Sequence, residues 1–312
     1  MLSKIVVTVC TASHLAQAKA LGDSLLKYNP GYKLIIGLAD KLDGRVAPAY
    51  YQPHELIEAS ELSIPRFGEM VKQYSLLELS CALKYFFVDF AMKKYNSEKI
   101  IFLDSDILVF DSFGFLENEL EQFSILVSPH IATPYPDDNK RPIEREMLKN
   151  GIFNAGFFAF KYDENGKAFL DWMKSRMIDQ CYVDPKQALN ADQSWFNFVP
   201  VYFHKVNIIL HPGINVAYWN LHERKLSKQG EKYFVNDQPL IFFHYSGYST
   251  GHPGEISKHQ DRISFDASST LKELFKLYHS VLINNGHERM LSLKCFYKKT
   301  GSNIFTKLTK KR

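Results

Sequence analysis

Short apolar runs alternate with amphipathic stretches from the start of the chain. The run Lys4–Val9 is continuous and β-branched, which predicts a strand buried on both faces. Leucine and alanine then recur at helical spacing from His14 to Tyr28, and the helix is expected to end at the breaker Asn29-Pro30-Gly31. Lys33–Ala39 predicts a second strand. A strand, a helix and a strand in this order indicate a parallel α/β sheet.

The alternation of strand and helix patterns continues to about residue 243. Helices are predicted over Glu69–Lys94 and Gly166–Met177 and from Asp192, and strands over Ile100–Leu103, Ile107–Phe110, Ser124–Ser128, Phe153–Phe160 and Pro239–Phe243. This order predicts an α/β fold with a mainly parallel central sheet flanked by helices. We expect one large domain over residues 1–265 and a small helical, basic C-terminal extension over residues 266–312.

Composition narrows the class of protein. The chain has 312 residues, of which 46% are hydrophobic, so it can bury a substantial core. A net charge of +4 gives no reason to expect a nucleic-acid partner. Neither Gly-x-Gly-x-x-Gly nor Gly-x-x-x-x-Gly-Lys-Ser/Thr follows the first strand, which argues against dinucleotide-binding Rossmann domains and P-loop NTPases.

The cysteines and the apolar runs bear on location. Cys10, Cys81, Cys181 and Cys295 are widely spaced, which predicts reduced thiols rather than disulfides or a zinc site. The N-terminus lacks the pattern of a signal peptide, and no apolar run reaches the roughly 18–20 residues that span a bilayer. We therefore expect a cytoplasmic protein, either free or peripheral on the inner face of the membrane.

Positive charge is concentrated in a C-terminal tail. Eight Lys or Arg residues and no acidic residue lie between Arg289 and Arg312, interleaved with apolar side chains. A basic, partly apolar segment suits the surface of an anionic membrane, whereas the alternative is a merely solvated terminus. The tail therefore predicts an anionic membrane surface as a partner.

Two carboxylates, Asp104 and Asp106, stand between the apolar runs Ile100–Leu103 and Ile107–Phe110. Unpaired buried charge is costly, so a neutralising partner is expected. A divalent cation such as Mg²⁺ or Mn²⁺ prefers oxygen ligands of this kind and bridges to a substrate diphosphate. The alternative is that Asp104-Ser105-Asp106 is a simple turn.

Three further polar groups adjoin apolar runs. His244 follows Leu240–Phe243 and is either a metal ligand or a hydrogen-bonded structural residue. Asn154-Ala155-Gly156 lies among phenylalanines and is either a bulge or a sugar-binding segment in which Gly156 leaves room for the sugar. Asp192 stands at an apparent helix start, where it is either an N-cap or a functional carboxylate.

Four segments, in order and spacing, resemble the retaining glycosyltransferases of family eight, the group of glycogenin and bacterial lipopolysaccharide galactosyl- and glucosyltransferases. They are Phe102–Ile107, Phe153–Phe157, Asn190–Asn197 and Phe243–Gly247, and the resemblance spans roughly residues 4–250. It implies a GT-A fold and a metal-dependent transfer of a hexose from a UDP-sugar to a glycan or lipid-linked glycan acceptor, as in bacterial surface polysaccharide synthesis, with retention. It also implies that Asp104, Asp106 and His244 bind Mn²⁺ (or Mg²⁺).

The resemblance assigns further contacts. Gln193 would lie near the anomeric carbon, where its amide oxygen stabilises an oxocarbenium-like transition state, and Asp192 would bind donor hydroxyls or act as nucleophile. The expected substrate-binding residues are Thr8, Cys10, Thr11, Ala12, Lys84, Asp104, Ser105, Asn154, Ala155, Gly156, Asp192, Gln193 and Gly247. The first four rest on topology, because ligands bind beyond the carboxyl ends of parallel strands. Lys84 would reach the diphosphate, unless it only lines a solvated helix face.

Two alternatives remain at this stage. In an inverting GT-A transferase, Asp192 would be the general base for the acceptor, and a catalytically silent relative would only bind nucleotide sugars. The family pattern His-x-x-Gly-x-x-Lys also ends here in Thr250, so Lys258, His259 and Arg262 are the candidates for the missing positive charge. Trp219 is expected either to stack on a sugar or to pack in the core.

Overall fold

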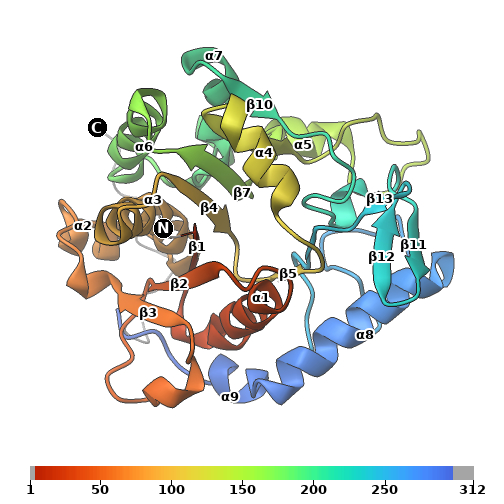
Figure 1. Ribbon diagram of the computed structural model, residues 1–312, viewed down its shortest axis with the longest axis horizontal. Helices are drawn as coiled ribbons and strands as arrows, with labels where there is room; N and C mark the ends of the chain where they lie inside the picture. Colours follow the sequence, from red (N-terminus) through yellow and green to blue (C-terminus); the bar gives the residue numbers. More distant parts are fainter. Residues whose placement is uncertain (1–3, 298–312) are drawn as a thin grey trace.

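A computed structural model describes residues 4–297 of the chain. A seven-stranded sheet has the order β10-β6-β7-β4-β1-β2-β3 (Figure 1). Its strands are β1 (Lys4–Cys10), β2 (Tyr32–Leu38), β3 (Glu55–Glu58), β4 (Lys99–Leu103), β6 (Ile125–Pro129), β7 (Phe153–Lys161) and β10 (Val206–Ile208). All neighbouring strands are parallel except β7, which runs antiparallel to β4 and β6. The prediction of a mainly parallel α/β sheet is confirmed.

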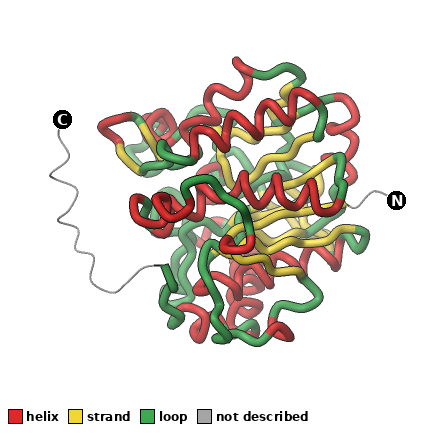
Figure 2. Tube along the Cα trace, turned by 90° about the vertical axis from the view of Figure 1, so that its left-hand side faces the viewer, coloured by secondary structure: helices red, strands yellow, loops and turns green. Residues whose placement is uncertain are grey.

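Both faces of this sheet are covered by helices, as Figure 2 shows. Ile5 and Val7 pack with residues of α3 (Leu76–Tyr95) and α6 (Glu164–Met177). Val6 points the other way and packs with α1 (Leu15–Tyr28) and α4 (Gly114–Gln122). Successive side chains of a strand alternate between faces, so a strand covered twice needs a continuous apolar run. This explains the sequence of β1.

The predicted helix over Glu69–Lys94 is two helices, α2 (Phe67–Gln73) and α3. The hydroxyl of Ser75 accepts from the backbone N–H of Glu78 at 3.3 Å, and the Glu78 carboxylate accepts from the backbone N–H of Ser75 at 2.7 Å. This capping box starts α3 afresh, and the single-helix prediction is wrong because a Ser-x-x-Glu signal interrupts the apolar stripe.

A two-stranded antiparallel pair joins distant parts of the chain. It consists of β5 (Ile107–Val109) and β14 (Phe242–His244), with Ile107 opposite His244. The predicted strand Pro239–Phe243 is thus divided between β13 (Gln238–Pro239) and β14. The pairing brings the end of the Asp104–Asp106 turn beside His244, although about 140 residues separate them in sequence.

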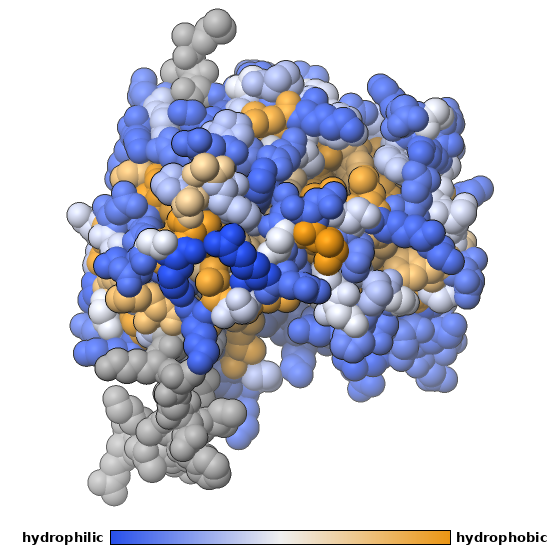
Figure 3. All heavy atoms as spheres, turned by 90° about the horizontal axis from the view of Figure 1, so that it is seen from below, coloured by the Kyte–Doolittle hydropathy of each residue, from blue (hydrophilic) through white to orange (hydrophobic). Residues whose placement is uncertain are grey.

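Two C-terminal helices complete the fold. They are α8 (Ser269–Asn284) and α9 (His287–Leu291), and Leu274 and Tyr278 of α8 share an apolar cluster with Phe243 and Tyr245. Seen from the side of α8 and α9, the surface is mainly hydrophilic with separate hydrophobic patches (Figure 3). The division into residues 1–265 and 266–312 stays a prediction, and residues 298–312 of the basic tail lie outside the described residues.

The remaining elements are short. They are α5 (Glu144–Asn150), α7 (Val199–Tyr202), β8 (Val183–Asp184), β9 (Leu189–Asn190), β11 (Leu226–Gln229), β12 (Lys232–Val235) and 3-10 turns at Ala12–His14, Pro48–Tyr50, Ala59–Glu61, Pro185–Gln187, Gln193–Phe198, Tyr218–Asn220 and Phe265–Ala267. None of the four cysteines, all within residues 4–297, takes part in a disulfide. Within residues 4–297, none of the helices combines the length and the apolar character needed to cross a bilayer.

Candidate active site

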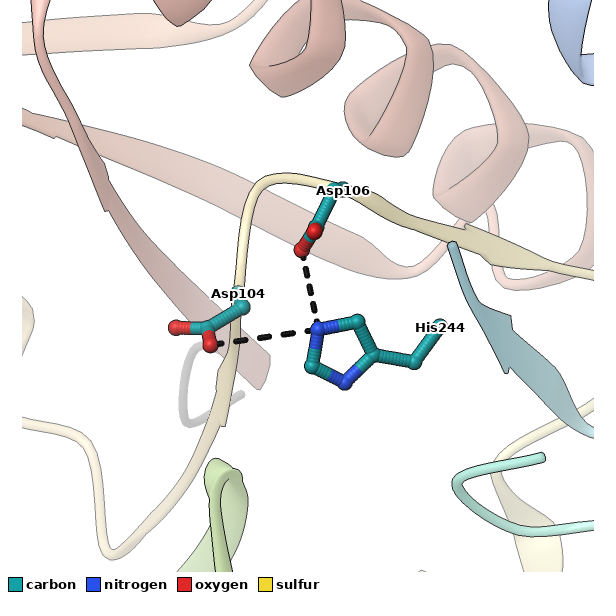
Figure 4. A group of neighbouring side chains, drawn as sticks. All are labelled: Asp104, Asp106 and His244. Atoms are coloured by element: carbon teal, nitrogen blue, oxygen red, sulfur yellow. Dashed lines mark ion pairs between the residues drawn. The ribbon is translucent and has the colours of Figure 1, made fainter. Parts of the chain in front are cut away.

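Three potential metal ligands converge at the carboxyl end of β4. Asp104 follows β4, Asp106 precedes β5 and His244 ends β14, and one ligand atom from each lies within 4.8 Å of the others. His244 Nε2 is 3.0 Å from Asp106 Oδ1 and 4.0 Å from Asp104 Oδ2 (Figure 4). The segment is also a turn at Ser105–Asp106, so the two interpretations of Asp-Ser-Asp are compatible.

The charges in this triad compensate one another. Burial alone would lower the pKa of His244, but Asp106 and Asp104 outweigh it and raise that pKa. Burial would raise the pKa of Asp106, but His244 outweighs it and holds that pKa below its usual value. Burial raises the pKa of Asp104, against the opposing effect of Lys84 and His244. Two carboxylate oxygens and one imidazole nitrogen form a donor set that suits a divalent metal ion, which would take over the role of the imidazolium charge.

Lys84 links the triad to a second buried carboxylate. Its Nζ lies 3.1 Å from Asp104 Oδ1 and 3.3 Å from Asp192 Oδ2, and it donates to the carbonyl of Ala155 at 3.0 Å. Burial would lower the pKa of Lys84, but the two carboxylates outweigh it and keep the pKa above its usual value. Lys84 is only 5% exposed, so it is not part of a solvated helix face.

Asp192 is 2% exposed, and its Oδ2 accepts from the hydroxyl of Tyr85 at 2.9 Å. It precedes a 3-10 helix, Gln193–Phe198, without donating or accepting a side-chain capping bond. Asp192 thus holds the N-cap position of this helix without a side-chain capping bond, and its carboxylate turns toward α3 instead. Tyr85 has no distinguishing signal in the sequence, because a tyrosine on a buried helix gives no sign that it bonds Asp192.

The segment Asn154-Ala155-Gly156 is a bulge in β7. Phe158 pairs with Val127 and Phe153 pairs with Pro129, so β7 uses five steps where β6 uses two. This shift in register agrees with the bulge alternative, and the Asn154 side chain lies within hydrogen-bonding distance of Gln193. Nδ2 of Asn154 donates to Oε1 of Gln193 at 3.1 Å, while Nε2 of Gln193 donates to the carbonyl of Asn150 at 2.8 Å.

Two positions require glycine, because neighbouring side chains lie too close to the backbone to leave room for a Cβ. A Cβ on Gly156 would lie 2.6 Å from His244 Cε1 and 2.7 Å from both Asn154 Oδ1 and Asp104 Oδ2. A Cβ on Gly247 would lie 2.4 Å from Ser257 Oγ, and its φ of +74° already favours glycine. Only a residue without a side chain lets the backbone pass so near the triad at Gly156, and so near Ser257 and His259 at Gly247.

The end of β1 forms a tight, buried corner. Thr8, Cys10, Thr11 and Ala12 are each at most 7% exposed, and Asp40 Oδ2 accepts from the backbone N–H of Ala12 at 3.3 Å. Burial and the nearby Asp40 raise the pKa of the Cys10 thiol. Asp40 was missed in the sequence, although it directly follows the apolar run of β2 just as Asp104 follows β4.

A cavity of about 440 Å³ lies beside Gly247, which follows His244 by three residues. It is lined mainly by polar side chains and the Gly247 loop: His14, Gln17, Gly247, Tyr248, Ser249, His252, Glu255, Lys258, His287 and Leu291. His14 is near enough to Asp106 that the carboxylate opposes the lowering of the His14 pKa by burial. Lys258 thus lies beside Gly247, and its backbone N–H donates to the Gly247 carbonyl at 3.3 Å.

Of the other two candidates for this charge, Arg262 is engaged elsewhere, whereas the His259 ring lies beside Gly247. Arg262 pairs with Asp138 at 2.7 Å and donates to the carbonyls of Lys140 and Pro142 at 2.6 and 3.0 Å. The His259 ring lies against Tyr218, with centroids 5.9 Å apart. Trp219 is only 3% exposed and meets His130 and His244 edge-on, so its ring is packed inside the protein.

Comparisons with known proteins show the family of this chain. The family model of glycosyl transferase family 8 matches residues 53–250, more than half of the chain. YfnF of Bacillus subtilis (strain 168), an uncharacterised protein, is 26% identical over 255 residues, which cover 80% of this chain and 84% of YfnF. YfnD of the same organism, also uncharacterised, is 22% identical over 251 residues, or 78% of this chain and 77% of YfnD.

Solved structures share the fold. The glycosyltransferase GlyE of Streptococcus pneumoniae TIGR4 matches with a TM-score of 0.51 and 18% identity over 95% of this chain. The match covers 66% of the GlyE chain, so the chain spans just under two thirds of that protein. An active-site mutant of LgtC matches with a TM-score of 0.51 and 14% identity, covering 88% of this chain and 95% of LgtC. The fold is therefore GT-A, and the chain belongs to glycosyl transferase family 8 and is a glycosyltransferase.

Proposed function

We propose that this glycosyltransferase moves a hexose from a UDP-sugar to a glycan acceptor with retention of configuration, using Mn²⁺ or Mg²⁺. The observation that carries the proposal is the convergence of Asp104, Asp106 and His244 within 4.8 Å, beside the buried Lys84–Asp192 pair. A metal held there would neutralise the charge that develops on the departing diphosphate. The uridine would lie at the end of β1, against Thr8, Cys10, Thr11 and Ala12.

Lys84 is proposed to hold Asp104 and Asp192 in place. Its three Nζ protons match its three short contacts, to Asp104, Asp192 and the carbonyl of Ala155. A direct contact between Lys84 and the diphosphate stays a prediction. Lys258 is the better-placed cation for the diphosphate, because it lines the cavity beside Gly247 together with His14.

Retention is proposed from the places of Gln193 and Asp192. Both polar atoms of the Gln193 amide are fixed, so its oxygen is held on the inner side of the site, toward Asn154 and Ala155. There it could stabilise positive charge at the anomeric carbon. Asp192 is 2% exposed and paired with Lys84, a setting that suits a contact with donor hydroxyls better than deprotonation of an acceptor. Asn154, Ala155, Ser105, Gly156 and Gly247 would complete the donor pocket.

The test is hydrolysis of a panel of UDP- and GDP-hexoses. Release of the nucleoside diphosphate is measured with Mn²⁺, with Mg²⁺ and with EDTA. We expect release from a UDP-hexose with either metal and none with EDTA. Equal release in EDTA would remove the metal from the mechanism. Release from GDP-hexoses alone would contradict the assignment of the nucleotide.

A membrane surface is proposed as a second partner for the C-terminal tail. In its described part, Leu291 and Phe296 are each 50% exposed beside the basic residues Arg289 and Lys294. Such a segment would bring the site to a lipid-linked acceptor. Truncation after Tyr297, which keeps α9 and Leu291 in place, should weaken binding to vesicles of anionic lipid at low salt while hydrolysis of a UDP-hexose continues. Equal binding by the truncated chain would refute the anchor.

A further inference from the structure

The two ring nitrogens of His244 face different partners. Nε2 faces the carboxylates, and Nδ1 points away from them (Figure 4). Nδ1 lies 3.3 Å from Oδ1 of Asn215. Asn215 is fully buried, and its backbone has the left-handed φ of 54°. An amide oxygen only accepts hydrogen bonds, so this contact keeps a proton on Nδ1, and Nε2 is the nitrogen that would give up its proton to bind a metal.

A chain of buried hydrogen bonds fixes which end of the Asn215 amide faces His244. The carbonyl of Ile152 lies 3.1 Å from Nδ1 of His130, which must therefore be the donor. Nε2 of His130 is then an acceptor, and Nδ2 of Asn154 lies 3.4 Å from it. Oδ1 of Asn154 accepts from Nδ2 of Asn215 at 3.1 Å, which leaves Oδ1 of Asn215 toward His244.

An independent contact gives the same orientation of the Asn154 side-chain amide. The backbone N–H of Gly156 donates to Oδ1 of Asn154 at 3.1 Å, and a backbone N–H cannot accept. The orientation of Asn154 is thus determined twice, once through His130 and once through the bulge of β7. Asn154 also donates to Oε1 of Gln193 at 3.1 Å. The Asn154 amide therefore connects Gln193 with Asn215, the partner of His244.

We propose that Asn215 is a positioning residue that holds His244 in the tautomer whose Nε2 binds the divalent metal. Asn215 is the last link before His244 in a relay of hydrogen bonds that runs from the carbonyl of Ile152 through His130 and Asn154. The inference rests on the metal site of the proposed function. Partners of this kind orient a metal-binding imidazole, and their loss typically lowers metal affinity by 10–100-fold. The relay also ties the orientation of His244 to that of Gln193.

The experiment is a Mn²⁺ titration without donor, in which electron paramagnetic resonance measures the free aqueous ion. Asn215→Gly removes both side-chain bonds, and glycine accepts the φ of 54° without strain. Asn215→Asp keeps an acceptor for Nδ1 and loses the donor to Asn154. Asn29→Ala is the control, because this buried amide bonds only the backbone of Asp111 and Phe113. Thermal unfolding is recorded for every variant.

We expect Asn215→Gly to weaken Mn²⁺ binding by about 10–100-fold. Asn215→Asp should bind Mn²⁺ at least as tightly as wild type, and Asn29→Ala should lose stability but stay within about twofold of the wild-type affinity. Wild-type affinity in Asn215→Gly, or an equal loss in Asn215→Asp, would overturn the role of Asn215. No Mn²⁺ binding by the folded wild-type protein would overturn the metal site itself and the inference with it.

Discussion

Replacement of Lys84 by methionine tests the buried charge balance of the site. The change keeps an unbranched apolar stem but removes the cation that lies 3.1 Å from Asp104 and 3.3 Å from Asp192. At an effective dielectric constant of about 20, each contact corresponds to about 5 kcal/mol of Coulomb attraction. The Asp104 side chain is 29% exposed, so solvent screens its attraction to Lys84. In Lys84→Met, Asp192 is left buried without its cation. Loss of one partner of a buried pair usually costs about 3–5 kcal/mol.

The assay is urea unfolding at pH 7.5 in EDTA, so that no metal compensates Asp104. We expect Lys84→Met to lower the free energy of unfolding by about 3–5 kcal/mol. Asp192→Asn in the Lys84→Met background should recover at least half of this loss, since the unpaired charge is then gone. A loss below about 1 kcal/mol in Lys84→Met would refute the reasoning, as would strictly additive losses in the double variant.

Three further predictions follow from the same contacts. Burial, with a smaller effect of His244, lowers the pKa of His130 from 6.5 to about 4, so the folded protein resists its protonation. Wild type should therefore lose about 2 kcal/mol more stability than His130→Gln between pH 7 and pH 5, and parallel stability curves would contradict this. Gly156→Ala should weaken Mn²⁺ binding by roughly tenfold or more, since its methyl group would meet His244 and Asp104; Gly31→Ala, with nothing within 4 Å, is the control and should bind normally. NMR of the anomeric proton should show an α-linked product from an α-linked donor, and a β linkage would rule out retention.

Most of the helices and strands could be predicted from local patterns in the sequence. The boundaries of β1 and α1 follow from a β-branched run and from leucines at helical spacing, both of which are properties of neighbouring residues. The prediction over Glu69–Lys94 failed because the apolar stripe continues through Ser75 and hides a capping signal. The division of the last strand between β13 and β14 depends on pairing with β5, which no local pattern contains.

The candidate site divides in the same way. Asp104, Asp106 and His244 are recognisable because polar residues end apolar runs, and the structure brings all three together. Asn215 and Tyr85 carry no such signal. Their roles arise from contacts with residues 29 and 107 positions away, His244 and Asp192. The sequence therefore indicates which residues carry charge, whereas their orientation is determined by side chains that only the fold assembles.

The most direct test of the central claim compares UDP release from a UDP-hexose by wild type and by Asp106→Ala, both shown to be folded, at saturating Mn²⁺. Loss of a metal ligand removes several kcal/mol of transition-state stabilisation, so we predict a fall in rate of roughly a thousandfold. Addition of EDTA should reduce wild type to the rate of the variant. An Asp106→Ala rate within tenfold of wild type would contradict metal-dependent transfer at this site.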